Sequence, residues 1–159
     1  MIIIKKNKIC KVILYIQDTG EEKEEMNLLN QSKEKIVIDI KLHTIPKKNS
    51  QQILFNSRTK RPFIQQSDRY LEFEKLCGYY LKKYKCLNIN KPINLKCTFY
   101  VPDKRRRDLA NLLESIQDIL VKYGVIADDN YLIIKGVDGS RIVYEKNRSE
   151  TIIEIEEVN

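Results

Sequence analysis

Residues 102–130 read PDKRRRDLANLLESIQDILVKYGVIADDN and decide how the rest of the chain is interpreted. Asp is a favoured N-cap residue, because its short carboxylate accepts a hydrogen bond from a free N–H of the first helical turn. Gly is favoured just after the last turn. The stretch therefore predicts a helix that begins after Asp108 and ends before Gly124. Apolar residues recur between them at helical spacing and predict the face in the core: Leu109, Leu112, Leu113, Ile116, Leu120 and Tyr123.

Acidic side chains gather around this predicted helix. At about 100° per residue, Ala110, Glu114 and Asp118 lie on one flank. Helical side chains lean toward the N-terminus, so Glu114 and Asp108 could share that end of the helix. A second acid pair, Asp128–Asp129, follows the helix. Taken singly, these acids are a helix cap, a solvated helix face and a turn. Four basic residues, Lys104 to Arg107, come directly before Asp108. The spacing of the acids beside these cations favours a metal-dependent nuclease site next to a phosphate-binding loop.

This spaced set resembles the RusA family of Holliday junction resolvases. The matching residues are Arg105-Arg106-Arg107-Asp108-Leu109, Asn111-Leu112, Asp118, Leu120, Gly124 and Asp128-Asp129, without gaps. Members of that family are small, homodimeric, Mg²⁺-dependent nucleases of phage and bacterial origin that cut four-way DNA junctions. The resemblance implies catalytic, metal-binding acids at Asp108 and at the pair Asp128–Asp129, with Asp129 the stronger candidate of the two.

Two positions depart from the family pattern. The family has an acid two residues after the first Asp, where this chain has Ala110. It also has a functional lysine one helical turn later, where this chain has Glu114. We expect Glu114 to replace the missing metal ligand and to share the catalytic role. Two alternatives stay open: Ala110 marks an impaired protein that still binds branched DNA, or Glu114 is an ordinary surface residue.

Composition limits the class of protein and its partners. The 159 residues are 42% hydrophobic and 32% charged, which predicts one soluble globular domain. The net charge of +7 favours a polyanionic partner but does not choose between DNA, RNA and acidic protein. A general nucleic-acid-binding module with structural acids is therefore a further hypothesis. No apolar run is long enough to span a bilayer, and we expect a cytoplasmic, DNA-associated protein.

The expected ligands and DNA contacts follow from side-chain chemistry. Carboxylate oxygens suit Mg²⁺, or Mn²⁺ in its place, whereas the cysteines lack the spacing of a zinc site. We expect DNA phosphates to contact the loop residues Lys104, Arg105, Arg106 and Arg107. A second basic segment, residues 44–67, has no acid and is interpreted as a mobile loop on the DNA backbone. Its cations are Lys47, Lys48, Arg58, Lys60 and Arg61.

Two aromatic residues lie in this second basic segment. Phe55 and Phe63 are expected to anchor it to the core. Base stacking in a DNA junction is the alternative interpretation.

The remaining patterns predict an α/β (α+β) fold with a single mixed sheet and two main helices, RusA-like and homodimeric. Residues 1–35 are interpreted as an N-terminal extension and residues 36–159 as the nuclease domain. Within the extension we expect one or two strands in 1–18 and a polar linker or short helix in 18–35. Asp138-Gly139 is expected to form a hairpin turn. The other predicted elements are strands at 36–43, 92–101, 131–137, 141–146 and 151–158, and a helix at 68–85.

Overall fold

The computed structural model describes residues 35–158. The strands expected in residues 1–18, and nearly all of the polar linker or short helix expected in residues 18–35, lie outside the described residues, and the domain boundary near residue 36 stays a prediction. The elements in chain order are β1 (Lys35–Ile40), the 3-10 turn η1 (Lys48–Ser50), β2 (Gln51–Phe55), β3 (Pro62–Gln66), α1 (Asp68–Leu81), the 3-10 turn η2 (Lys82–Tyr84), β4 (Ile93–Val101), α2 (Leu109–Lys122), β5 (Ile134–Gly136), β6 (Arg141–Tyr144) and β7 (Glu150–Glu157).

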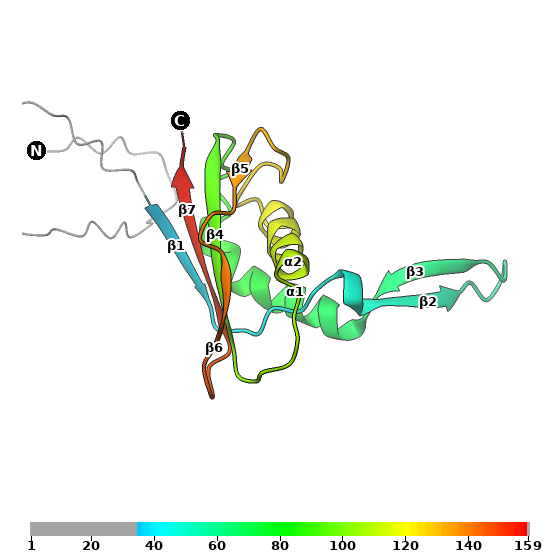
Figure 1. Cartoon of the computed structure of the whole chain (residues 1–159). Coiled ribbons are helices and arrows are strands. Elements are labelled where there is room, and N and C mark those ends of the chain that lie inside the picture. The colour runs from blue at the N-terminus through cyan, green and yellow to red at the C-terminus, as the bar shows by residue number, and fades with distance from the viewer. Residues whose placement is uncertain (1–34, 159) are drawn as a thin grey trace, which may run out of the picture.

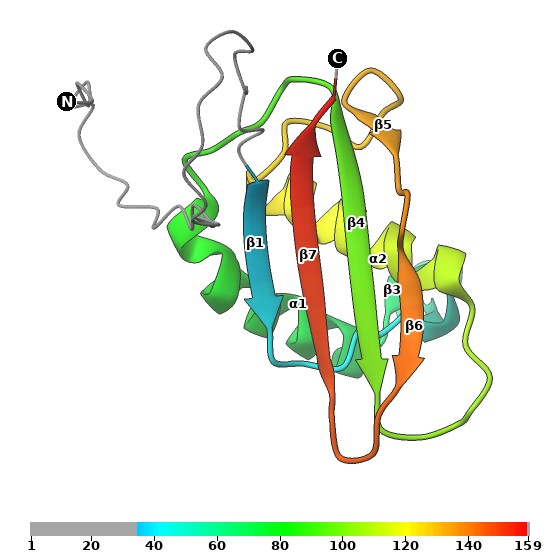
Figure 2. The same ribbon diagram turned by 60° about the vertical axis from the view of Figure 1, so that its left-hand side comes forward.

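One mixed sheet forms the body, and both long helices cover the same face of it (Figures 1 and 2). The strand order is β1–β7–β4, and β5 and β6 both lie beside β4. The pairs β1–β7 and β7–β4 are antiparallel, whereas β4–β5 and β4–β6 are parallel. This arrangement confirms the predicted α+β fold with a mixed sheet and two main helices.

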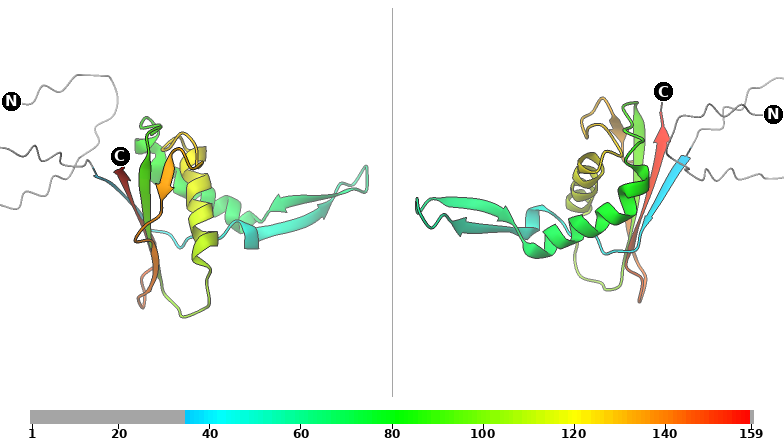
Figure 3. Two further views of the ribbon diagram at one scale, coloured as in Figure 1. Left: turned by 45° about the horizontal axis from the view of Figure 1, so that its top comes forward. Right: turned by 180° about the vertical axis from the view of Figure 1, so that it is seen from behind.

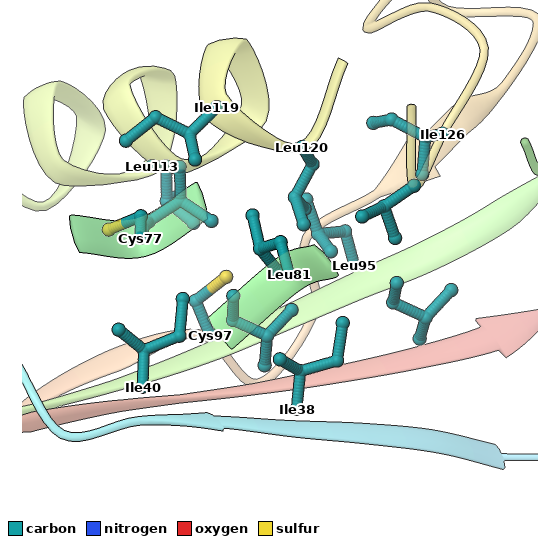
Figure 4. Close-up of a cluster of buried hydrophobic side chains, with 14 of the residues drawn as sticks. Ile38, Ile40, Cys77, Leu81, Leu95, Cys97, Leu113, Ile119, Leu120 and Ile126 are labelled. Atoms are coloured by element: carbon teal, nitrogen blue, oxygen red, sulfur yellow. The ribbon is translucent and has the colours of Figure 1, made fainter. Parts of the chain in front are cut away.

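The core lies between the sheet and the helices (Figure 4). Strand β4 alternates, and its inward residues include Leu95 and Cys97, which are fully buried. Helices α1 and α2 can approach closely because Gly78 of α1 leaves room for the ring of Tyr123. A Cβ at Gly78 would lie 2.5 Å from that ring, so the glycine has a packing function here. No helix in residues 35–158 is long and apolar enough to cross a membrane.

The hairpin predicted at Asp138-Gly139 is wrong. Strands β5 and β6 do not pair with each other, because both run parallel to β4. Between the end of β5 and the start of β6, the side chain of Asn94 on β4 forms hydrogen bonds to the backbone of Asp138. Its Oδ1 accepts from the N–H of Asp138 at 2.9 Å, and its Nδ2 donates to the carbonyl oxygen of Asp138 at 3.3 Å. The Asp-Gly pair therefore bends one edge of the sheet instead of reversing the chain.

The loop predicted at residues 44–67 is also wrong, because most of it is ordered as the antiparallel ribbon β2–β3. This ribbon forms a separate two-stranded sheet that projects away from the body (Figures 1 and 3). Phe55 and Phe63 are 68% and 44% exposed, so neither anchors the segment to the core. The local sequence gave no strand signal, since neither face of the ribbon is buried and no polar–apolar alternation results.

Candidate active site

Asp108 is the N-cap of α2, as predicted. Its Oδ1 accepts a hydrogen bond from the backbone N–H of Ala110 at 2.9 Å, and its Oδ2 accepts one from Nδ2 of Asn111 at 3.1 Å. The residue is exposed, and the helix dipole favours a negative charge at this position. Each carboxylate oxygen has two lone pairs and uses one in these bonds, so the group keeps the capacity to bind a cation.

The four cations of the loop before α2 have different surroundings. The Arg107 side chain is only 13% exposed; its guanidinium lies 2.8 Å from Oδ1 of Asp103 and donates to the carbonyl oxygens of Asp103 and Arg105. The Arg107 hydrogen bond lowers the pKa of Asp103 to about 2. Arg105 and Arg106 are exposed, and Lys104 lies over an aromatic ring of β6. Arg107 therefore holds the loop together, while Arg105 and Arg106 are directed to solvent.

An open cavity of about 400 Å³ lies beside Asp108. The surrounding residues are His43, Thr44, Pro46, Arg106, Arg107, Asp108, Asn111 and Leu112. Burial, with Arg107 nearby, lowers the pKa of His43, so its imidazole is neutral at neutral pH. Sequence reasoning missed His43 as a neighbour of Asp108. The proximity arises where the segment after β1 crosses the start of α2, and no local pattern reports such a contact.

That same segment is fixed to α2 by three contacts. The backbone N–H of Lys47 donates to Oγ of the buried Ser115 at 2.7 Å. Nζ of Lys47 lies 2.5 Å from Oδ2 of Asp118, and Nζ of Lys48 lies 2.9 Å from Oε2 of Glu114. The two lysines predicted to bind DNA thus neutralise acids of α2 within the chain. The hydrogen bond to Glu114 raises the pKa of Lys48, and the negative charge of Asp108 raises it further. Lys48 therefore interacts electrostatically with both acids.

The second acid pair lies beyond the other end of α2. Oδ1 of Asp128 accepts from the N–H of Asp129 at 2.8 Å, and its Oδ2 accepts from Nδ2 of Asn130 at 2.7 Å. The Asn130 hydrogen bond lowers the pKa of Asp128. Asp129 is exposed, but partial desolvation of its carboxylate raises its pKa, and the neighbouring Asp128 and Asp118 raise it further. One acid of the pair is therefore stabilised as an anion, while the other is destabilised and would gain from a nearby cation.

The two groups of acids lie toward opposite ends of α2. Asp118, which affects Asp129 electrostatically, lies about 15 Å beyond Asp108 at the rise of an α-helix. Ligand oxygens of Mg²⁺ lie about 2.1 Å from the ion. In agreement, no three His, Cys, Asp or Glu side chains come together as a metal site within residues 35–158. The acids predicted as ligands have suitable oxygen donors, but residues 35–158 do not bring Asp108, Glu114, Asp128 and Asp129 together in one cluster.

The remaining predicted DNA contacts lie at the tip of the β2–β3 ribbon. Oδ1 of Asn56 accepts hydrogen bonds from the N–H groups of Arg58 and Thr59, which closes the tip. Arg58, Lys60 and Arg61 are all exposed there. These cations are free to meet a polyanion at a site well away from Asp108.

Comparison with known proteins places the chain in a nuclease family. The family model described as endodeoxyribonuclease RusA matches residues 44–156, which include the ribbon, both helices and both acid clusters. A protein of Aquifex aeolicus (strain VF5), described as crossover junction endodeoxyribonuclease RusA, is 37% identical over 67 residues, or 42% of this chain and 51% of that protein. The chain thus spans about half the length of this curated relative. Because the family model covers most of the sequence, the chain belongs to the RusA endodeoxyribonuclease family.

Proposed function

We propose that this protein is a Mg²⁺-dependent endonuclease that resolves four-way DNA junctions by paired symmetric nicks, in recombination and repair. The observation that carries the proposal is the exposed Asp108 carboxylate, which borders an open cavity beside the solvent-directed Arg106. Family membership supports the nuclease chemistry, and the name of the Aquifex aeolicus relative supports the junction substrate. Arg105 and Arg106 bind phosphates beside the scissile bond.

The proposed metal site is shared between two copies of the chain. Asp108 of one copy and Asp129 of the other would hold the ion, and Asp128 and Glu114 would be further ligands. The lack of a three-acid cluster within residues 35–158 supports this arrangement, because neither group of acids supplies enough carboxylates alone. When bound, Mg²⁺ activates water and stabilises charge on the phosphate. A C2 dimer also suits the approximate two-fold symmetry of a four-way junction, since it places two sites on opposed strands.

A mixing experiment tests the shared site. Asp108→Asn and Asp129→Asn are prepared separately, and each alone is expected to be inactive on a labelled four-way junction. In a mixed dimer, one site carries both substitutions and the other carries neither. Nicking activity should therefore return when the two variants are mixed and allowed to exchange subunits. Because only one site is intact, single nicks should outnumber paired ones.

The control is the doubly substituted chain, which should stay inactive when mixed with either variant. If the two single variants remain inactive together although they exchange subunits, the acids do not act in trans. Calorimetric titration with Mg²⁺ gives a readout that does not depend on cleavage, and each single variant should bind the ion more weakly than the unmodified protein.

A second candidate function is a branched-DNA-binding protein with impaired catalysis. Two observations favour it: Ala110 stands where the family has an acid, and Lys48 already neutralises Glu114. This alternative predicts tight, structure-selective junction binding without cleavage, in Mg²⁺ or in Mn²⁺. Cleavage that appears only after Ala110→Asp would support it.

A further inference from the structure

The stem of the β2–β3 ribbon is apolar on both of its faces. The register pairs Ile53 with Ile64, Leu54 with Phe63 and Phe55 with Pro62. Because side chains alternate along a strand, the first and third of these pairs share one face and the second pair lies on the other. Ile53 and Ile64 are 69% and 67% exposed. Within the described part of the chain, residues 35–158, this stem is open to solvent.

A ribbon of this kind needs something to cover it. An isolated two-stranded hairpin is at best marginally stable in water, and packing against another element is what makes it persist. A contiguous exposed apolar surface marks an interaction site. The body does not fill this role, because the ribbon projects away from it and joins it only at the base (Figure 3).

The charge distribution favours protein over DNA as the partner of the stem. The ten residues of β2 and β3 contain no charged side chain. The cations of this segment are confined to the tip and to Lys47 and Lys48 at the base, where both are paired with acids of α2. DNA binding draws most of its affinity from cations at the phosphates. A stem with two apolar faces and no cation fits an apolar protein surface instead.

The geometry of the proposed shared site indicates which protein surface it meets. The base of the ribbon is fixed beside Glu114 and Ser115, in the N-terminal half of α2. A second copy that brings its Asp129 to this end of the helix also brings the residues that follow Asp129. Among them, Tyr131 and Leu132 are 76% and 57% exposed. The apolar stem and this apolar turn would then lie against each other twice in a C2 dimer.

We propose that the β2–β3 ribbon is an exchange arm whose apolar stem packs on a second copy of this chain, against Tyr131 and Leu132. The inference rests on the proposed homodimer and names the surface that forms it. The arm of each copy then stabilises the partner's Asp128–Asp129 turn next to its own Asp108. Formation of the dimer and completion of the metal site become one event.

The test measures the dimer dissociation constant by analytical ultracentrifugation over a concentration series. Ile53→Thr with Ile64→Thr keeps β-branched residues in the strands but removes apolar surface. We expect this double variant to weaken the dimer about 100-fold, and Leu132→Ser on the receiving surface to weaken it about tenfold. Val37→Thr is the matched control: Val37 is also a half-exposed strand residue, on the body, and its variant should dimerise normally.

Each outcome decides the inference. Leu132→Ser leaves the ribbon sequence intact, so a weaker dimer there cannot be attributed to melting of the ribbon. If both variants dimerise as tightly as the unmodified chain, the arm is not the interface, although trans complementation between Asp108→Asn and Asp129→Asn could still succeed. Unchanged dimerisation with loss of junction binding would assign the stem to DNA and overturn the inference. A chain that is monomeric throughout the series would also overturn it.

Discussion

The two ends of α2 both present acids, but different forces place them. At the first end, Asp108 is fixed by helix capping, through its bonds to Ala110 and to Asn111. At the far end, a turn holds Asp128 and Asp129 side by side, and their pKa values shift in opposite directions. The first end offers one carboxylate held by two hydrogen bonds, whereas the second places two carboxylates side by side. A cation held between Asp108 of one copy and Asp129 of another would offset the charge repulsion at the acid pair and use the fixed position of Asp108.

The largest effect is expected from Asp108→Asn. Asn caps a helix about as well as Asp, so the start of α2 and the thermal midpoint should be preserved. Loss of the anionic ligand should nevertheless reduce junction cleavage by about 100-fold or more, with junction binding retained. Cleavage rates, gel-shift binding and a thermal melt of the same preparation check this expectation. Normal cleavage would remove Asp108 from the metal site.

Two neighbouring arginines should separate binding from folding. Arg106→Ala removes an exposed cation, so junction affinity should fall about tenfold and the slope of log affinity against log salt should become less steep by about one. Arg107→Ala instead removes an ion pair and two hydrogen bonds to carbonyls, and should cost about 2 kcal/mol of folding free energy. Salt-dependent binding and chemical unfolding measure the two effects. Equal losses of stability would contradict the division of roles.

Most of α2 and its first acid could be predicted from sequence because the signals are local. The Asp108 cap, the apolar period and Gly124, which adopts a φ of +67°, specify the helix within its own residues. The predicted helix 68–85 and strand 92–101 agree with α1 and β4 for the same reason. Each of these elements buries one face, so apolar residues recur along its sequence at the spacing of a helix or of a strand.

The features that could not be predicted depend on contacts between distant segments. His43 and Ser115 become part of the site only because the segment after β1 crosses α2. Asp138-Gly139 looks like a hairpin turn in the sequence, but Asn94 of β4 binds Asp138, and β5 and β6 both pair with β4. Neither face of the ribbon β2–β3 is buried by the other described residues, so its sequence shows no periodic pattern and resembles that of a loop.

A smaller effect is expected from Ala110→Asp, which restores the family acid. The position is exposed in the first turn of α2, where a negative charge is favourable, so stability should not fall. Activity should stay within a few-fold of the unmodified protein or rise, because an extra ligand adds to the site. Glu114→Gln is the companion variant. A marked loss of cleavage on Ala110→Asp would contradict this expectation and would indicate that the site, with Glu114 as a ligand, does not accept a carboxylate at position 110.

The smallest effect distinguishes the two acids beyond the end of α2. The raised pKa of Asp129 means that its charged form is disfavoured in the folded state, so stability is lost as pH rises above the ordinary value of 3.8. The lowered pKa of Asp128 has the opposite sign: its stabilisation is present above 3.8 and is lost as pH falls through the lower folded value.

Metal-free Asp129→Asn should therefore melt about 1 °C higher than the unmodified protein at pH 7, and Asp128→Asn about 1 °C lower, given solvent screening. Both differences should shrink as the pH falls below 4. Shifts of the same sign for the two variants would contradict the electrostatic contrast between them. The rise in melting temperature expected for Asp129→Asn is the more informative of the two results. A residue that lowers the stability of its own fold is typical of a position kept for binding.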